Sequence, residues 1–178
     1  MKIDWKNISI KELAGLISEC LRKDGIDAVL VGGACVSIYS KNRYISYDLD
    51  YVTYEDKQTV KVSLEKIGFH LKQKHFAHSE CPFLIEFVTP PVAVGKEAVR
   101  HFQNLSTTLG SIKLFRDVDC VKDRLASYYH WDDKAALNQA IEVCLERKID
   151  FDELEKWSKE EGFSEKFVRF VEAYQSLL

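Results

Sequence analysis

The sequence lacks the features of a membrane, secreted or disulfide-stapled protein. No apolar run in the 178 residues approaches the length that spans a bilayer, and residues 1–6 are too polar for a signal peptide. The five cysteines are odd in number and form no CxxC pair, which favours reduced, mostly buried thiols. We therefore expect a cytoplasmic protein with no membrane association.

The sequence also has no excess of positive charge. It contains 25 Lys and Arg against 28 Asp and Glu, so the net charge is −3, which excludes a basic footprint over the whole surface for nucleic acid. A local basic patch stays compatible with these numbers. There is no internal repeat, low-complexity segment or Gly/Ser linker, and 46% hydrophobic residues are typical of a globular protein.

What is present divides the chain into an α/β part and a helical part. Ser9 and Glu12 form a capping box for a first helix that ends at Gly25. Apolar patterns and breakers predict the following elements: strands over 26–31, 48–53 and 83–88, a hairpin over 107–115 turning at Gly110-Ser111, and helices over 34–39 and 57–68.

From residue 117 the apolar period becomes helical and stays so. We predict helices over 120–129, 133–147 and 151–159 and a last helix from 164, with Asp117, Asp150 and Ser164 as caps. The expected fold is thus α/β (α+β): residues 1–116 form a mixed sheet flanked by helices, and residues 117–178 form a helical bundle packed on it.

The most informative motif is the pair Asp48 and Asp50. Alternate residues of a strand share a face, so both carboxylates project together while Leu49 points into the core. Paired carboxylates are a hard-oxygen site for Mg²⁺. Upstream, Gly32-Gly33 follow a buried strand and precede a helix, where phosphate can approach the backbone. Together these features indicate metal-dependent chemistry on a nucleotide.

Nucleotidyl transfer needs about three carboxylates around two metal ions. Glu86 interrupts an apolar strand, where a charge has no other evident reason to be, and is the candidate third ligand. Arg43, just before the aspartate strand, is placed to grip a phosphate bidentately.

These motifs resemble the DNA polymerase β-like nucleotidyltransferase superfamily: Gly32-Gly33, a short helix, Asp48-Leu49-Asp50, and an acid on a later strand. Within it the chain is similar to small bacterial nucleotidyltransferases of toxin–antitoxin and abortive-infection systems. The segment 112–125 followed by His130-Trp131-Asp132-Asp133 resembles the block after the core of such proteins. The resemblance covers about residues 26–135.

The resemblance implies transfer of a nucleoside monophosphate from a nucleoside triphosphate to a hydroxyl acceptor, which is an RNA, a protein or a small molecule. It implies that Asp48, Asp50 and Glu86 are catalytic and hold two Mg²⁺ ions, and that Gly32 and Gly33 bind the triphosphate. Lys122 resembles a lysine that recurs in the toxin-type members and implies phosphate binding. Arg124, two residues on, is expected to face elsewhere. A cognate toxin or antitoxin protein is the implied partner.

Three departures from the family pattern support an alternative. Gly33-Ala34 lacks the hydroxyl that often follows the first glycine, the interval before Asp48 is long, with a turn expected near residues 41–43, and the third acid is Glu. The alternative is a catalytically inactive binding or regulatory module, for example antitoxin-like.

Three further patterns have weaker interpretations. His75, His78 and Cys81 have zinc-ligand spacing without a convincing fourth ligand, and Cys120 has no evident His partner for nucleophilic catalysis. We interpret residues 128–131 as a seam between core and helical bundle, with a base-stacking platform as the alternative.

Overall fold

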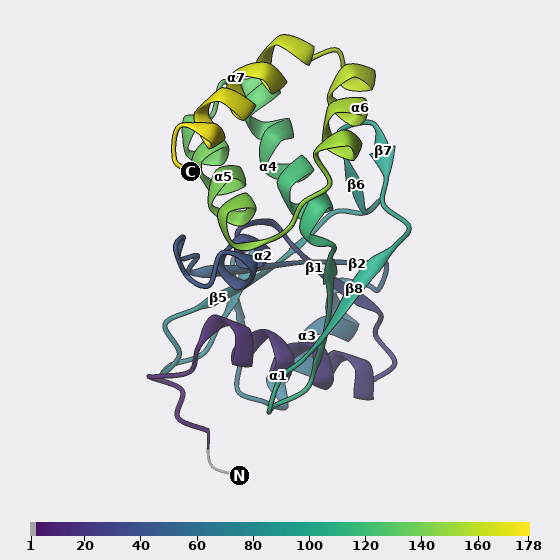
Figure 1. Ribbon diagram of the computed structural model, residues 1–178. Helices are drawn as coiled ribbons and strands as arrows, with labels where there is room; N and C mark the ends of the chain where they lie inside the picture. Colours follow the sequence, from purple (N-terminus) through teal and green to yellow (C-terminus); the bar gives the residue numbers. More distant parts are fainter. Residues whose placement is uncertain (1–2) are drawn as a thin grey trace.

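The computed structural model describes residues 3–178, in which a seven-stranded mixed sheet forms the centre (Figure 1). The strands follow the order β3-β4-β5-β2-β1-β9-β8. Their bounds are β1 Ala28–Val31, β2 Asp48–Thr53, β3 His70–Lys72, β4 His75–Ala77, β5 Leu84–Val88, β8 Phe102–Ser106 and β9 Ser111–Phe115. A separate hairpin consists of β6 Ala93–Val94 and β7 Glu97–Ala98.

Seven helices in residues 3–178 surround the sheet. Their bounds are α1 Ile10–Lys23, α2 Gly32–Tyr39, α3 Lys57–Glu65, α4 Asp117–Trp131, α5 Lys134–Glu146, α6 Phe151–Glu161 and α7 Ser164–Gln175. The predicted fold class is confirmed: a mixed sheet is flanked by helices, and the chain ends in a helical bundle.

The three strands predicted over residues 26–31, 48–53 and 83–88 are β1, β2 and β5, and they form the middle of the sheet. Every residue of β1 is buried, as expected for a continuous apolar run covered on both faces. β1 pairs antiparallel with β2 and parallel with β9, and β2 pairs parallel with β5. The strand carrying the aspartates is therefore held between two strands along most of its length.

Helix α1 covers one face of this sheet. The Ser9 side chain accepts a hydrogen bond from the backbone N–H of Glu12 (3.2 Å), which confirms the predicted cap. The apolar stripe Leu13, Ile17 and Leu21 is fully buried, and each such side chain contributes roughly 1.5–3 kcal/mol. From β2, the Tyr51 hydroxyl donates to the Ala14 carbonyl (3.0 Å). Leu49 and Tyr51 thus face α1, so the alternate residues of β2 face the other way.

The short strands were not predicted. β3 and β4 are not among the elements that the apolar pattern predicts, because three-residue strands rich in His and Lys have no clear apolar alternation. The hairpin predicted over 107–115 is wrong in extent: its strands are β8 and β9, and residues 107–110 form the turn. The β6–β7 hairpin was likewise missed.

Two of the predicted helix caps in the C-terminal part are wrong. Helix α4 begins one residue earlier than a cap at Asp117 would allow, because Asp117 is its first helical residue and its carboxylate accepts from the N–H of Val118 (2.9 Å). Ser164 is likewise the first helical residue of α7. Asp150 does cap α6, accepting from two backbone N–H groups, as predicted.

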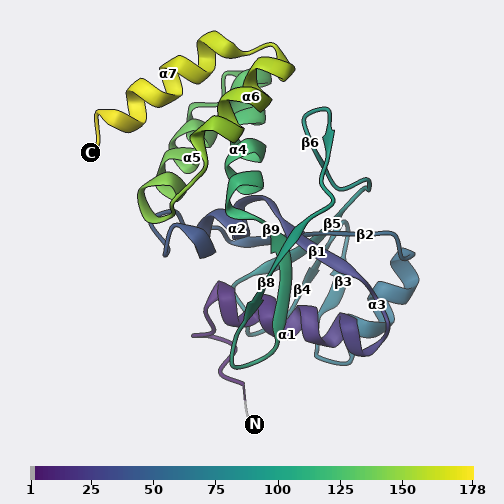
Figure 2. The same cartoon turned by 45° about the vertical axis from the view of Figure 1, so that its right-hand side comes forward.

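The helical part packs on the sheet side opposite α1 (Figure 2). Helices α4 and α5 contact α2, and one continuous hydrophobic cluster of buried side chains runs from α1 through the sheet into α4–α7. In this view the β6–β7 hairpin rises from the sheet toward α4 and α6. The sheet face bearing the aspartates is therefore bordered by α2, α4 and the segment around this hairpin.

The aromatic cluster at residues 128–131 is not a seam between the two parts. Tyr129 stacks on Trp157 and Phe163 within the helical part, with ring centroids 5.7 and 5.0 Å away, and its hydroxyl bonds Ser158. Trp131 is 82% exposed at the end of α4.

Within residues 3–178, no helix is long and apolar enough to cross a bilayer.

Candidate active site

The predicted aspartate pair lies on β2, on the face opposite α1. Asp48 is exposed and Asp50 is half-buried, while Leu49 between them is fully buried, as the strand alternation predicts. Ser46 holds the start of this strand: its hydroxyl donates to the carbonyl of Asp48 (3.0 Å), and its N–H donates to the hydroxyl of Ser37 (2.8 Å). The register of the pair is thus fixed from α2.

The loop between α2 and β2 contains the predicted extra turn. Lys41 and Asn42 have positive φ values of 52° and 63°, and the N–H of Asn42 donates to the carbonyl of Ser37 (2.9 Å). The long interval between Gly33 and Asp48 therefore contains a tight left-handed turn directly after α2.

Gly32 brings the backbone against Asp50. Gly32 is the first residue of α2 and has a φ of +67°, a conformation that favours glycine. A Cβ atom at this position would lie 2.7 Å from Oδ2 of Asp50. A side chain at position 32 would therefore clash with the carboxylate. Because glycine has none, Asp50 lies beside the N-terminus of α2, and a helix N-terminus favours anions.

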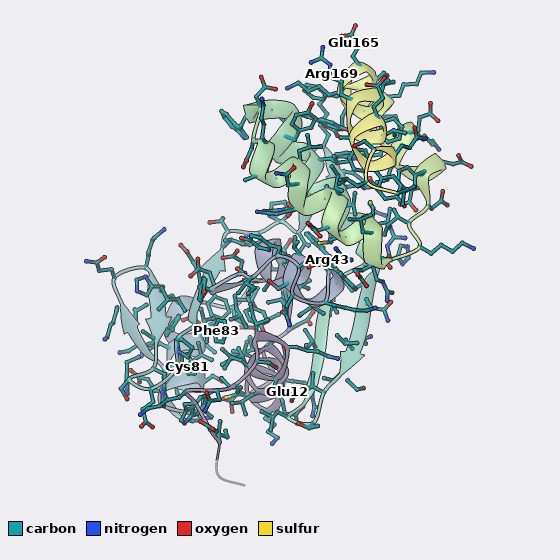
Figure 3. All side chains as sticks on the ribbon, turned by 60° about the vertical axis from the view of Figure 1, so that its left-hand side comes forward. Glu12, Arg43, Cys81, Phe83, Glu165 and Arg169 are labelled. Atoms are coloured by element: carbon teal, nitrogen blue, oxygen red, sulfur yellow. The ribbon has the colours of Figure 1, made fainter. Side chains whose placement is uncertain are left out.

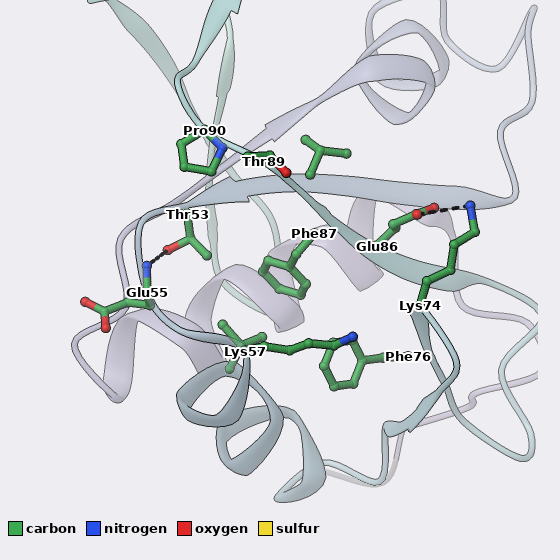
Figure 4. Close-up of a pocket in the computed structure, with 11 residues that line it drawn as sticks. Thr53, Glu55, Lys57, Lys74, Phe76, Glu86, Phe87, Thr89 and Pro90 are labelled. Atoms are coloured by element: carbon green, nitrogen blue, oxygen red, sulfur yellow. Dashed lines mark hydrogen bonds and ion pairs between the residues drawn. The ribbon is translucent and has the colours of Figure 1, made fainter.

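Glu86 faces the same side as the aspartates. It pairs with Asp50 in the parallel register of β2 and β5, and neighbouring residues in register share a face. Its carboxylate, however, is engaged: Oε1 lies 3.2 Å from Nζ of Lys74, as the dashed line in Figure 4 shows. Lys74 is 77% exposed, so this ion pair is weak and readily exchanged.

The electrostatics at Asp50 are those of an uncompensated anionic site. Burial raises the pKa of the Asp50 carboxyl to about 6, and the carboxylates of Asp48 and Glu86 act in the same direction. The guanidinium of Arg124 opposes them without balancing them. A cation that joined the carboxylates would remove this repulsion.

A pocket opens beside Asp50 between the sheet and α4. It is lined by Val31, Gly32, Asp50, Val52, Val88, Thr89, Pro91, Val92, Ala93, Phe115, Asp123 and Arg124. Arg124 is its basic side chain. The guanidinium is fixed by Asp123, through Nε (3.2 Å) and Nη2, and by the side-chain oxygen of Gln139 (3.2 Å). The expectation that Arg124 faces elsewhere is wrong.

The other two predicted basic residues lie against carboxylates of the helical part. Nε of Arg43 bonds Glu146 of α5 (2.8 Å), at the junction between the two parts of the molecule (Figure 3). Lys122 is 2% exposed, and its Nζ donates to Glu97 of β7 (3.0 Å) and Glu153 of α6 (2.9 Å). Neither residue lines the pocket beside Asp50, so phosphate binding by Arg43 and Lys122 stays a prediction.

The side chains at the site meet part of the requirement for binding a divalent cation. Asp48 and Asp50 present two carboxylates on one face, which suits Mg²⁺. Within residues 3–178, no group of three His, Cys, Asp or Glu side chains is arranged to hold a metal, and Glu86 is paired with Lys74. The same holds for the His75, His78 and Cys81 spacing, in which the His78 ring packs on Trp5 with centroids 4.3 Å apart.

Two solved structures resemble this chain. One is the crystal structure of an antigenic nucleotidyltransferase-like protein from Paracoccidioides brasiliensis, with a TM-score of 0.57 and 15% identity over 75% of this chain and 74% of that chain. The other is the solution structure of the antibiotic-resistance factor ANT(2'')-Ia, with a TM-score of 0.51 and 11% identity over 94% of each chain. The sequence matches no protein-family model, and no curated protein matches it significantly. At these identities the likeness shows that the chain has a nucleotidyltransferase-like fold.

Proposed function

We propose that this protein transfers a nucleoside monophosphate from a nucleoside triphosphate to a hydroxyl acceptor in a Mg²⁺-dependent reaction. The observation that carries the proposal is the half-buried Asp50, which lies beside the N-terminus of α2 at Gly32 and in one pocket with Arg124. An anionic group next to two anion-binding features is suited to a metal–triphosphate complex. The nucleotidyltransferase-like fold supports the same reaction class.

The residues have separate roles in this proposal. Asp48 and Asp50 hold Mg²⁺, which when bound would offset the charge of the triphosphate. Glu86 completes a two-ion set once Lys74 has left it. The first N–H groups of α2 and the guanidinium of Arg124 bind phosphate oxygens, and Asp123 with Gln139 keeps the guanidinium in place.

We assign the nucleoside to a surface that adjoins the pocket at Asp50. A second pocket shares Val52, Pro91 and Val92 with the pocket at Asp50 and continues over Tyr54 and Phe102. Aromatic faces of this kind stack on bases without strong sequence preference. We place the sugar and base here, so that the α-phosphate lies toward Asp50.

The acceptor and setting are also proposals. RNA, protein and small-molecule hydroxyls are the candidate acceptor classes, and a toxin–antitoxin role with a cognate partner protein follows from the sequence resemblance. We place the protein in the cytoplasm, because its five cysteines are all free thiols and such thiols persist in reducing compartments.

A second candidate function is a binding module that keeps the fold without turnover. The observation in its favour is the ion pair of Glu86 with Lys74, which occupies the third carboxylate. This module would bind nucleotide or a protein partner through the same pocket.

Label transfer separates the two functions. Wild-type protein is incubated with a cell lysate, Mg²⁺ and nucleoside triphosphates labelled at the α-phosphate, and RNA, protein and small-molecule fractions are counted. We expect label in one fraction for the wild type and for Glu160→Gln, which changes an exposed carboxylate of α6 outside the Asp50 pocket, and none for Asp50→Asn. Label that is equal with Asp50→Asn would contradict the proposal. Nucleotide binding without any transfer would favour the second function.

A further inference from the structure

The helical part carries an apolar groove that the proposed function does not use. This groove, the α6–α7 groove, runs between the N-terminal turns of α6 and the length of α7, at the end of the molecule away from the sheet (Figure 2). Its volume is about 590 Å³, against about 280 Å³ for the pocket at Asp50. Among residues 3–178, no residue lines both, so the groove is a separate feature of the surface.

The floor of the groove is apolar, because the apolar stripe of α7 is wider than the surface that the other helices cover. Phe170 of this stripe is fully buried, whereas Val168 is 54% exposed. Val171 and Tyr174 are half-buried and line the groove. The ring of Phe151 faces them from α6, with its centroid 5.2 Å from that of Tyr174. A helix face left partly uncovered in this way marks a surface for another apolar group.

The borders of the groove are acidic on both sides. Asp152 and Glu155 line it from α6, and Glu172 lines it from α7; all three are exposed. Within residues 3–178, no Lys or Arg lines the groove. None of the three carboxylates forms a salt bridge in this part of the chain, in contrast to Glu153, which pairs with Lys122. The negative charge of the borders therefore favours a positively charged ligand.

The shape of the groove suits a helix. Its two walls are helices, and a third helix packs in such a furrow by placing its side chains between theirs. Residues 167–174 of α7 span two turns, roughly 10 Å, which matches the distance between the first and last anchors of an i, i+3, i+7 pattern. Apolar anchors for the floor and basic residues for both borders define an amphipathic, cationic helix.

We propose that the α6–α7 groove docks an amphipathic helix of a partner protein, whose apolar stripe is flanked by Lys or Arg. The stripe packs on Val168, Val171 and Tyr174, and the basic side chains meet the carboxylates of Glu155 and Glu172. The inference goes beyond nucleotidyl transfer and does not depend on it, because the groove and the pocket at Asp50 share no residue of the described chain.

The test uses a synthetic peptide of leucine and lysine, about 14 residues long, with leucine at helical i, i+3, i+4 and i+7 spacing. A second peptide has glutamate in place of every lysine and keeps the leucine pattern. Both are titrated into the full-length protein at low salt, about 20 mM, where exposed charges are weakly screened, and amide chemical shifts are followed.

Two variants separate the contributions of charge and apolar contact. The first is the double substitution Glu155→Gln and Glu172→Gln, and its matched control is Glu160→Gln with Glu165→Gln. The control removes two exposed carboxylates from the same two helices outside the groove, so both proteins have the same net charge. The second variant, Val168→Asp, adds an acidic group to the groove while it removes part of the apolar floor.

We expect the lysine peptide to shift amides of residues 151–155 and 167–175, and the glutamate peptide to bind at least about tenfold more weakly. The double variant should lose about fivefold in affinity for the lysine peptide, and the control should lose less than about twofold. Val168→Asp should also bind more weakly, by about tenfold, because the lost apolar contact outweighs the added charge.

Four results would overturn the inference. These are equal binding of the two peptides, equal losses in the double variant and its control, tighter binding by Val168→Asp, and shifts that lie outside the groove. Sedimentation of the protein alone adds a fifth: a dimer whose formation Val168→Asp abolishes would make the groove an interface between two copies of this chain, which contradicts a partner helix.

Discussion

Replacement of Asp50 by Asn is expected to stabilise the metal-free protein. Burial of the carboxyl, together with the negative charges of Asp48 and Glu86, raises its pKa from 3.8 to about 6. Each pKa unit corresponds to about 1.4 kcal/mol, so ionised Asp50 costs up to about 3 kcal/mol of folding free energy. Because the group is partly exposed, we expect a gain of about 1–3 kcal/mol for Asp50→Asn at pH 7.5.

The sign of the pH dependence follows from the direction of the pKa change. The folded state binds the proton of Asp50 more tightly than the unfolded state, so the free energy of unfolding falls as pH rises from about 4 to about 6. The Asn variant lacks this fall. The stability difference between the variant and the wild type should therefore be small near pH 4 and fully developed at pH 7.5.

Urea denaturation in EDTA at both pH values measures this difference. Glu55→Gln is the control, because it removes an exposed carboxylate outside the Asp50 pocket and should leave stability unchanged. If Asp50→Asn gave no gain at pH 7.5, or the same gain at both pH values, the electrostatic account of the site would be wrong.

Three further substitutions test the backbone at Gly32 and the packing of the helical part. Gly32→Ala should destabilise the protein by about 2–3 kcal/mol and weaken nucleotide binding, because φ is +67° and the new Cβ would meet the carboxylate of Asp50; denaturation and calorimetric titration check both. Lys122→Met should cost about 1–3 kcal/mol in urea denaturation by leaving Glu153 without its buried partner, and should leave nucleotide affinity unchanged if Lys122 is structural; a large loss of affinity would restore its predicted phosphate role. Asp150→Ala should lower the free energy of unfolding by about 1 kcal/mol through loss of the α6 cap, and a neutral effect would refute that cap.

The centre of the fold could be predicted because its signals are local. The run Ala28–Val31 is uniformly apolar, and the alternation around Leu49 places one face of β2 in the core. The turn at Gly32 follows from the same segment. These local patterns were sufficient to bring Asp48, Asp50 and Gly32 together as a candidate site.

The basic residue of the pocket could not be predicted in the same way. Lys122 and Arg124 are two positions apart on a helix and therefore point in different directions, which the sequence does show. Which of the two directions faces Asp50 depends on how α4 docks on the sheet. The partners that bury Lys122, Glu97 and Glu153, lie in a hairpin and in a later helix.

The ion pair between Glu86 and Lys74 could not be predicted from the sequence either. An interrupted apolar run predicts the place of Glu86 on a strand, and the pairing of β2 with β5 sets it next to Asp50. Lys74 comes from the turn between β3 and β4, two strands of three residues with too little alternation to be recognised. The ion pair that occupies Glu86 is thus a product of sheet topology.

Calorimetric titration of ATP into the protein with Mg²⁺ and with EDTA tests the central claim most directly. We predict binding to the wild type that requires Mg²⁺, and binding at least about 30-fold weaker in Asp50→Asn, which corresponds to about 2 kcal/mol. Undiminished Mg²⁺-dependent binding by Asp50→Asn would contradict the assignment of Asp50 to a metal–triphosphate site.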